Sequence, residues 1–112
     1  MLGLAAMGLT WVDAEITNPG RRSRKSKLRF LVDSGAIYSM VPAPVLRKVG
    51  IRPLRTEIFE LADGRTARHK VGHALFRVQG KLGGSDVIFG GPRDEPLLGA
   101  VTLEEVGLEL DP

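Results

Sequence analysis

Turn-forming residues divide this chain into short segments. Fourteen glycines and seven prolines are distributed over 112 residues. Between the turns we predict about seven short strands, where apolar residues alternate with polar ones or form short blocks. These strands cover residues 9–18, 28–32, 37–41, 55–61, 66–78, 86–89 and 108–112. Because no long crossover helix is expected, the pattern argues against a doubly wound parallel sheet. It predicts that residues 1–112 form a single, mostly β, barrel-like domain.

Only short helices are expected between these strands. Residues 42–49 begin with prolines and are followed by Gly50, which is typical of a short helix. A second short helix is predicted over residues 102–107. There, Thr102 would be the N-cap and Glu105 would complete a capping box.

Two hairpins are predicted from their turns. Asp63 and Gly64 favour a type I′ turn between two strands. Residues 21–27 are all basic or serine, and we expect them to form a solvated hairpin tip whose charge blocks edge-to-edge pairing. A nucleic-acid-binding patch is the alternative, but the run lacks the aromatic side chains on which bases stack. We therefore expect no nucleic-acid partner.

An aspartate directly follows an apolar strand at residues 30–36. Phe30, Leu31 and Val32 lead into Asp33, and Ser34 and Gly35 come next. We expect this arrangement to bury the Asp33 carboxylate beside a tight turn, which is costly unless the carboxylate is paired or hydrogen-bonded. An ordinary surface turn is the alternative, because Asp, Ser and Gly all favour turns.

Composition limits the remaining classes of protein. The absence of cysteine excludes disulfides and thiolate metal sites and is compatible with a reducing compartment. Residues 1–9 are apolar but lack a basic leading region, so a signal peptide is not expected. No stretch of ~18 apolar residues is present, and no membrane span is expected. We expect a cytoplasmic protein.

Metal and phosphate sites are weakly supported. His69 and His73 would lie roughly 13 Å apart along an extended strand, too far for one zinc ion, and no third ligand is evident. The pairs Gly83-Gly84 and Gly90-Gly91 do not open a helix, which phosphate binding would require. We expect neither a metal nor a cofactor.

Carboxylate chemistry remains, and it requires two acidic groups. Two adjacent carboxylates share one proton, so that one acts as base while the other acts as acid. Only Asp33 follows an apolar strand; the other aspartates lie in polar or turn contexts. A two-fold symmetric dimer would bring two copies of Asp33 together.

Three motifs occur in an order that resembles a known family. Residues 31–36, Leu-Val-Asp-Ser-Gly-Ala, resemble the active-site signature of the retropepsin-like, or retroviral-type, aspartic proteases. The hairpin at residues 61–65 lies where that family has its flap. Leu97-Leu98-Gly99, before a short helix, is similar to the family's apolar-apolar-Gly element. The run 97–112 looks most like the prokaryotic branch of the family.

The resemblance implies a closed, barrel-like acid-protease fold with a flap hairpin and one or two short helices. It implies an aspartic endopeptidase that acts on peptides or proteins as a homodimer, with one water activated between two Asp33 carboxylates. The implied supporting residues are Ser34, Gly35 and Ala36 in the active-site loop; Ala62, Asp63, Gly64 and Arg65 in the flap; and Leu97, Leu98 and Gly99 beside the loop.

Two departures from the family pattern leave an alternative open. Ala100 stands where viral members have a basic residue that helps to hold the dimer, and the flap tip is charged rather than glycine-rich and apolar. The alternative is a non-catalytic, dimeric interaction domain with the same fold.

Overall fold

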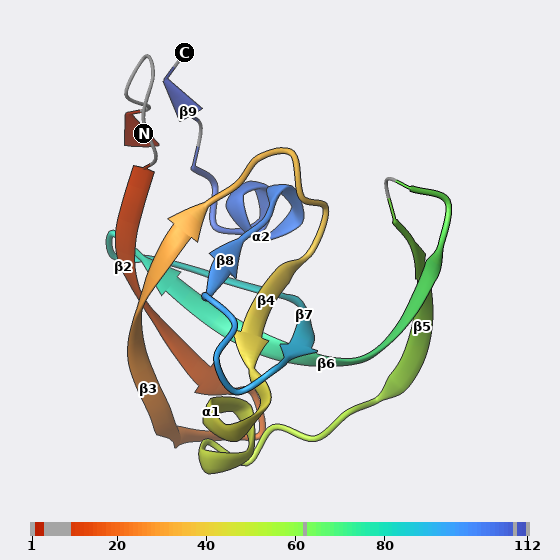
Figure 1. Cartoon of the computed structure of the whole chain (residues 1–112). Helices are drawn as coiled ribbons and strands as arrows, with labels where there is room; N and C mark the ends of the chain where they lie inside the picture. Colours follow the sequence, from red (N-terminus) through yellow and green to blue (C-terminus); the bar gives the residue numbers. More distant parts are fainter. Residues whose placement is uncertain (1, 4–9, 62, 109, 112) are drawn as a thin grey trace.

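A closed sheet forms most of the molecule (Figure 1). The computed structural model describes residues 2–3, 10–61, 63–108 and 110–111. The strands of the large sheet are β2 (Thr10–Asn18), β3 (Arg21–Val32), β4 (Ser39–Pro42), β5 (Arg55–Glu60), β6 (Thr66–Val78), β7 (Lys81–Gly90) and β8 (Leu97–Leu98). Their order is β2-β3-β8-β4-β7-β6-β5.

A further pairing joins the two sides of this sheet. Residues 14–17 of β2 pair with residues 75–78 of β6, in addition to the pairing of β2 with β3. Strands β2, β3, β8, β4, β7 and β6 therefore form a closed ring, and β5 pairs with β6 outside this ring. The predicted mostly β fold is confirmed, and the β5–β6 hairpin projects from the ring (Figure 1).

The core lies inside this ring and follows the strand alternation. Ile16 of β2, Phe30 of β3 and Phe76 of β6 are completely buried. The rings of Phe30 and Phe76 meet edge to face with centroids 6.1 Å apart. Such a pair adds about 0.5–1.5 kcal/mol to the area that it buries. The aliphatic residues expected to fill the core, such as Val41 and Leu98, are also completely buried.

Two helices cover the ends of the barrel. α1 (Ala43–Lys48) agrees with the predicted first helix, with Pro42 as N-cap and Gly50, φ 80°, just beyond its end. α2 (Ala100–Glu105) begins two residues before the predicted position, with Gly99 as N-cap. The prediction that Thr102 caps this helix is therefore wrong: Thr102 lies inside it and is completely buried.

Both predicted hairpins are present, but the tip of the first and the turn type of the second were predicted wrongly. The basic run 21–27 belongs to strand β3 rather than to a hairpin tip, because Arg21 already pairs with Asn18 across the turn. In the β5–β6 turn, the bonds from Gly64 N to Leu61 O and from Leu61 N to Arg65 O enclose a three-residue loop. Gly64 takes a positive φ of 84° but Asp63 does not, so Asp63 and Gly64 do not form a type I′ turn.

The two ends of the chain lie side by side (Figure 1). β1 (Leu2–Gly3) pairs in parallel with β9 (Leu110–Asp111). Of the predicted closing strand at 108–112, residues 110–111 form β9 and Leu108 is not part of it. Residues 109 and 112 lie outside the described residues.

Candidate active site

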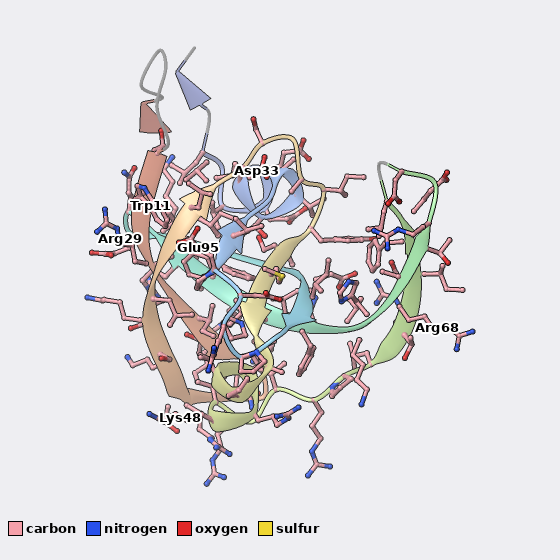
Figure 2. The ribbon with its side chains drawn as sticks, in the orientation of Figure 1. Trp11, Arg29, Asp33, Lys48, Arg68 and Glu95 are labelled. Atoms are coloured by element: carbon pink, nitrogen blue, oxygen red, sulfur yellow. The ribbon has the colours of Figure 1, made fainter. Side chains whose placement is uncertain are left out.

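Asp33 follows the last residue of β3 and begins a tight loop (Figure 2). Its Oδ1 accepts a 3.0 Å hydrogen bond from the backbone N–H of Gly35. Its carbonyl oxygen accepts a 3.1 Å bond from the N–H of Ala36. Asp33, Ser34 and Gly35 are exposed and Ala36 is half-buried. The expectation of a buried carboxylate is therefore wrong for the single chain: Phe30 and Val32 at the end of β3 are buried, but Asp33 is exposed.

Strand β8 holds the base of this loop. Leu31 and Val32 pair in parallel with Leu97 and Leu98. The N–H of Asp33 donates a 2.9 Å hydrogen bond to the carbonyl oxygen of Leu98. The apolar-apolar-Gly element and the Asp33 loop, more than 60 residues apart in the sequence, are thus directly bonded through their backbones.

The first turn of α2 holds the far side of the loop. The N–H groups of Ala100 and Val101 donate to the carbonyl oxygens of Ala36 and Ile37 at 2.8 and 3.1 Å. A helix leaves its first N–H groups without intrahelical partners, and here the loop satisfies two of them. This explains why α2 needs no side-chain cap. Residue 100 contributes its backbone N–H to these hydrogen bonds, so an alanine is sufficient at this position.

A chain of buried hydroxyl groups links the loop support to strand β7. Gly99 N–H donates to Ser39 Oγ at 2.9 Å, and Ser39 Oγ lies 2.5 Å from Thr102 Oγ1. Thr102 Oγ1 lies 2.7 Å from Ser85 Oγ, which donates to the carbonyl oxygen of Asp86. When Ser39 donates to Thr102, Thr102 to Ser85, and Ser85 to the carbonyl oxygen of Asp86, each of the three hydroxyl groups both donates and accepts a hydrogen bond. No signal in the sequence joins these positions, because they lie on separate elements.

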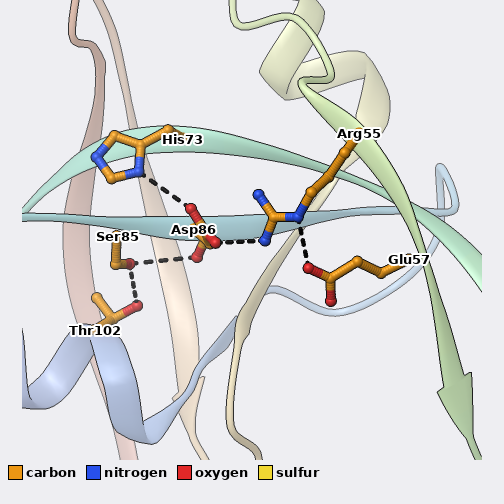
Figure 3. A network of polar contacts seen from close by, with 6 residues as sticks. All are labelled: Arg55, Glu57, His73, Ser85, Asp86 and Thr102. Carbon is orange, nitrogen blue, oxygen red and sulfur yellow. Dashed lines mark hydrogen bonds and ion pairs between the residues drawn. The ribbon is translucent and has the colours of Figure 1, made fainter.

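The side chain of Asp86 continues this network toward the flap (Figure 3). Asp86 lies 2.6 Å from Arg55 on β5 and 3.3 Å from His73 on β6, and Arg55 also binds Glu57 at 2.6 Å. Partial burial alone would raise the pKa of Asp86, but the hydrogen bonds from Arg55 and His73 outweigh it and hold the pKa below its usual value. The hydrogen bonds to Asp86 and Glu57 raise the pKa of Arg55 above its usual range.

The β5–β6 hairpin, here called the flap, contacts the segment after the Asp33 loop. The ring of Phe59 meets that of Tyr38 edge to face at 5.9 Å and that of His69 at 5.7 Å. At the tip, Arg65 forms an exposed ion pair with Asp63 at 2.6 Å. Gly64 provides the positive φ of the turn, and Ala62 lies outside the described residues.

The two histidines that were considered as metal ligands do not share a partner. His69 packs on Phe59 and His73 bonds to Asp86, so the two histidines have separate partners. Within the described ranges, no three His, Asp or Glu side chains are grouped as a metal site would require.

No described helix has the length and apolar character needed to cross a membrane.

The fold and this site define a class of protein. A closed β sheet, an Asp-Ser-Gly loop held by an apolar-apolar-Gly strand and a projecting hairpin are the features of a retropepsin-like aspartic protease. Residues 12–101 match the sequence profile of the aspartyl protease family. Since this match covers most of the chain, the protein belongs to the aspartyl protease family.

Solved structures of viral proteases are similar. The simian foamy virus (mac) protease is 28% identical, with a TM-score of 0.61 over 85% of this chain and 92% of that one. EIAV protease complexed with the inhibitor HBY-793 is 13% identical, with a TM-score of 0.69 over 97% and 98%.

A third structure is the foamy viral protease-reverse transcriptase in complex with an RNA/DNA hybrid. It is 19% identical, with a TM-score of 0.64 over 86% of this chain and 12% of that one. At 13% and 19% identity the likeness concerns the fold alone. No curated protein sequence matches the chain significantly.

Proposed function

We propose that the chain is an aspartic endopeptidase that works as a homodimer, with one Asp33 from each subunit in a shared active site. The single observation that carries this is the exposed Asp33 carboxylate on a loop whose backbone is bonded to β8 and α2. The loop of residues 33–37 carries one carboxylate, whereas this chemistry uses two. A second copy of the chain supplies the other through two-fold symmetry.

The proposed reaction uses the two carboxylates in opposite protonation states. The ionised Asp33 takes a proton from a bound water as the water oxygen attacks the peptide carbonyl carbon. The protonated Asp33 of the partner subunit donates to the carbonyl oxygen and supports the charge that develops there. Because the reaction needs one carboxylate protonated and the other ionised, we expect activity to have an acidic to mildly acidic optimum.

The other predicted site residues have supporting roles in this proposal. Ser34 forms hydrogen bonds across the dimer, Gly35 allows close approach of backbone, and Ala36 accepts from α2. Leu97, Leu98 and Gly99 hold the loop. The flap closes over an extended peptide, which binds through main-chain hydrogen bonds as an added strand does.

A non-catalytic, dimeric interaction domain is the second proposed function. The Asp63–Arg65 ion pair at the flap tip favours it, because a charged tip is less suited to covering an extended peptide in a water-free site. The two functions differ in whether a bound peptide is cut or released intact.

Two further assignments are part of the proposal. We place the chain in the prokaryotic branch, on the resemblance of residues 97–112. We take residues 1–112 as one domain, because the seven strands share one sheet and the buried apolar residues other than Val71 form one cluster.

Cleavage of a peptide library at about pH 3–8 tests the function. Wild type should cut, Asp33→Asn should not, and Asp13→Asn, which removes an exposed carboxylate on β2, should cut as wild type does. Equal cleavage by wild type and Asp33→Asn would overturn the mechanism. Capture of intact peptide by both, with no cleavage, would favour the interaction domain.

A further inference from the structure

Two adjoining surface cavities are lined by cations at the α1 end of the barrel. One, of about 370 Å³, is lined by Arg47, Arg68 and Lys70 together with His69. The other, of about 400 Å³, is lined by Arg24, Arg47 and Arg52. Arg47 and Pro53 line both cavities, so the two cavities lie next to each other. We call Arg24, Arg47, Arg52, Arg68 and Lys70 the basic surface.

The charges of the basic surface are not neutralised by neighbouring acids. Neither cavity has an Asp or Glu in its lining. Within the described part of the chain, none of the five cations forms an ion pair with a carboxylate. A third cavity shows the contrast: it is lined by Arg22, Lys25 and Arg77 but also by Glu15. Uncompensated arginines around a hollow form a site for an anion.

One arginine of the basic surface is held in place before any ligand arrives. The Nη2 of Arg24 donates a 2.5 Å hydrogen bond to the carbonyl oxygen of Lys48 at the end of α1. Its guanidinium packs over Gly50, where an added Cβ would lie 2.8 Å from Nη1. Fixing a side chain in advance lowers the entropy that a ligand must overcome on binding.

The lining also favours one kind of anion. Ala43, Pro53 and Phe89 give the cavity of about 370 Å³ apolar walls. Phe89 is the sole aromatic ring besides His69 in either lining, and it is 9% exposed. A single-stranded nucleic acid would need exposed rings for stacking. Arginine binds carboxylate and phosphate groups alike in a bidentate geometry. The apolar walls, which accept an aliphatic side chain, favour the carboxylates of a peptide.

We propose that the basic surface binds an acidic peptide segment of the substrate that also carries an apolar side chain. The basic surface extends from α1 to the flap: Arg47 lies in α1 and Arg24 bonds to its last residue, whereas Arg68 and Lys70 pair with β5. None of its residues belongs to the loop that carries Asp33. The identification of the segment as part of the substrate rests on the proposed endopeptidase function; the binding of an acidic peptide does not.

Fluorescence anisotropy with the Asp33→Asn chain tests the binding without cleavage. The probe is a labelled, glutamate-rich peptide with one central leucine. Replacing Arg47 and Arg52 by Gln should weaken binding at least about tenfold, since charge-assisted hydrogen bonds are lost. The matched control, Arg22→Gln with Lys25→Gln, removes equal charge from the cavity that contains Glu15 and should change binding less than about twofold.

Three results would overturn the docking site: no binding of the acidic peptide, equal weakening by both double variants, or tighter binding of oligothymidylate than of the peptide. Circular dichroism of each variant excludes unfolding as the cause. Cleavage of a neutral peptide by the wild type remains a separate measurement, so a failed docking site and a failed protease assignment are distinguishable.

Discussion

Gly99 lies against the main chain of Tyr38, with no space for a side chain between them. A Cβ atom at position 99 would come within 2.6 Å of the carbonyl carbon and oxygen of Tyr38. Backbone on both sides cannot give way as a flexible side chain can. This contact holds the segment after the Asp33 loop against the start of α2.

Replacing Gly99 by alanine should therefore lower the free energy of unfolding by about 1–3 kcal/mol, as overpacking does. Activity should fall as well, because the loop that holds Asp33 must move. Urea unfolding and peptide cleavage measure the two effects. Gly20→Ala is the matched control, since its Cβ would meet only Asn18 Oδ1 at 3.5 Å. Equal stability of the two variants would contradict the contact.

The buried hydroxyl chain should be sensitive to loss of its central member. Thr102→Val keeps the shape of the side chain but leaves Ser39 and Ser85 without their shared partner. We expect a loss of about 1–3 kcal/mol in the free energy of unfolding, the usual cost of unpaired buried polar groups. Thr102→Ser retains the hydroxyl and should be closer to wild type. If valine is tolerated better than serine, the hydrogen bonds do not stabilise this site.

The flap should open more often when its contact with Tyr38 is removed. Phe59→Ala deletes an edge-to-face ring pair, worth about 0.5–1.5 kcal/mol. Amide hydrogen exchange across β5 and β6 should accelerate by roughly two- to tenfold, since about 1.4 kcal/mol is a factor of ten. Ile58→Ala is the control, because Ile58 is 62% exposed on the same strand. The same acceleration in both variants would mean that Phe59 does not anchor the flap.

The ion pair at the flap base should make stability depend on pH. The pKa of Asp86 is lower in the folded chain than its usual value, so folding favours the ionised form. Its contribution is complete above the usual aspartate pKa of about 3.9 and is lost as the pH falls through the lowered folded value. Asp86→Asn should therefore be less stable than wild type at neutral pH, with a difference that narrows in acid.

Thermal unfolding of Asp86→Asn and wild type between neutral pH and about pH 3 measures this difference. Glu104→Gln is the control, because Glu104 is exposed and forms no ion pair among the described residues. A gap between Asp86→Asn and wild type that widens on acidification would have the wrong sign and would contradict the proposed role of Arg55.

Local patterns in the sequence were sufficient for β2, for the two strands of the flap and for the first helix, whereas β3 and β7 are longer than predicted and β8 was not predicted as a strand. Alternation in residues 10–18 and the turn at Asp63-Gly64 depend on neighbouring residues, so β2 and the flap were predicted in place. Thr102 resembled an N-cap because Glu105 follows at capping-box spacing. The backbone of residues 36 and 37 satisfies the start of α2 instead, and that long-range contact leaves no local signal.

The motifs of the site could be predicted from the sequence, but the hydrogen bonds that connect them could not. Asp33 and Leu98 were singled out separately, and their hydrogen bond follows from the parallel pairing of β3 with β8. Ser39, Ser85 and Thr102 are isolated polar residues in the sequence and meet only when three elements pack. The exposure of Asp33 also depends on tertiary structure, because an apolar strand can end either inside or at the surface.

Mixing of subunits tests most directly whether two copies of Asp33 share one active site. Asp33→Asn protein is added to a fixed amount of wild type and allowed to exchange before cleavage is measured, with albumin as the added protein in the control. An equal amount of variant should reduce activity to about one half, because about half of the wild-type chains then lie in mixed dimers with one carboxylate. Activity that is unchanged by an excess of variant, and linear in wild-type concentration, would contradict the shared pair.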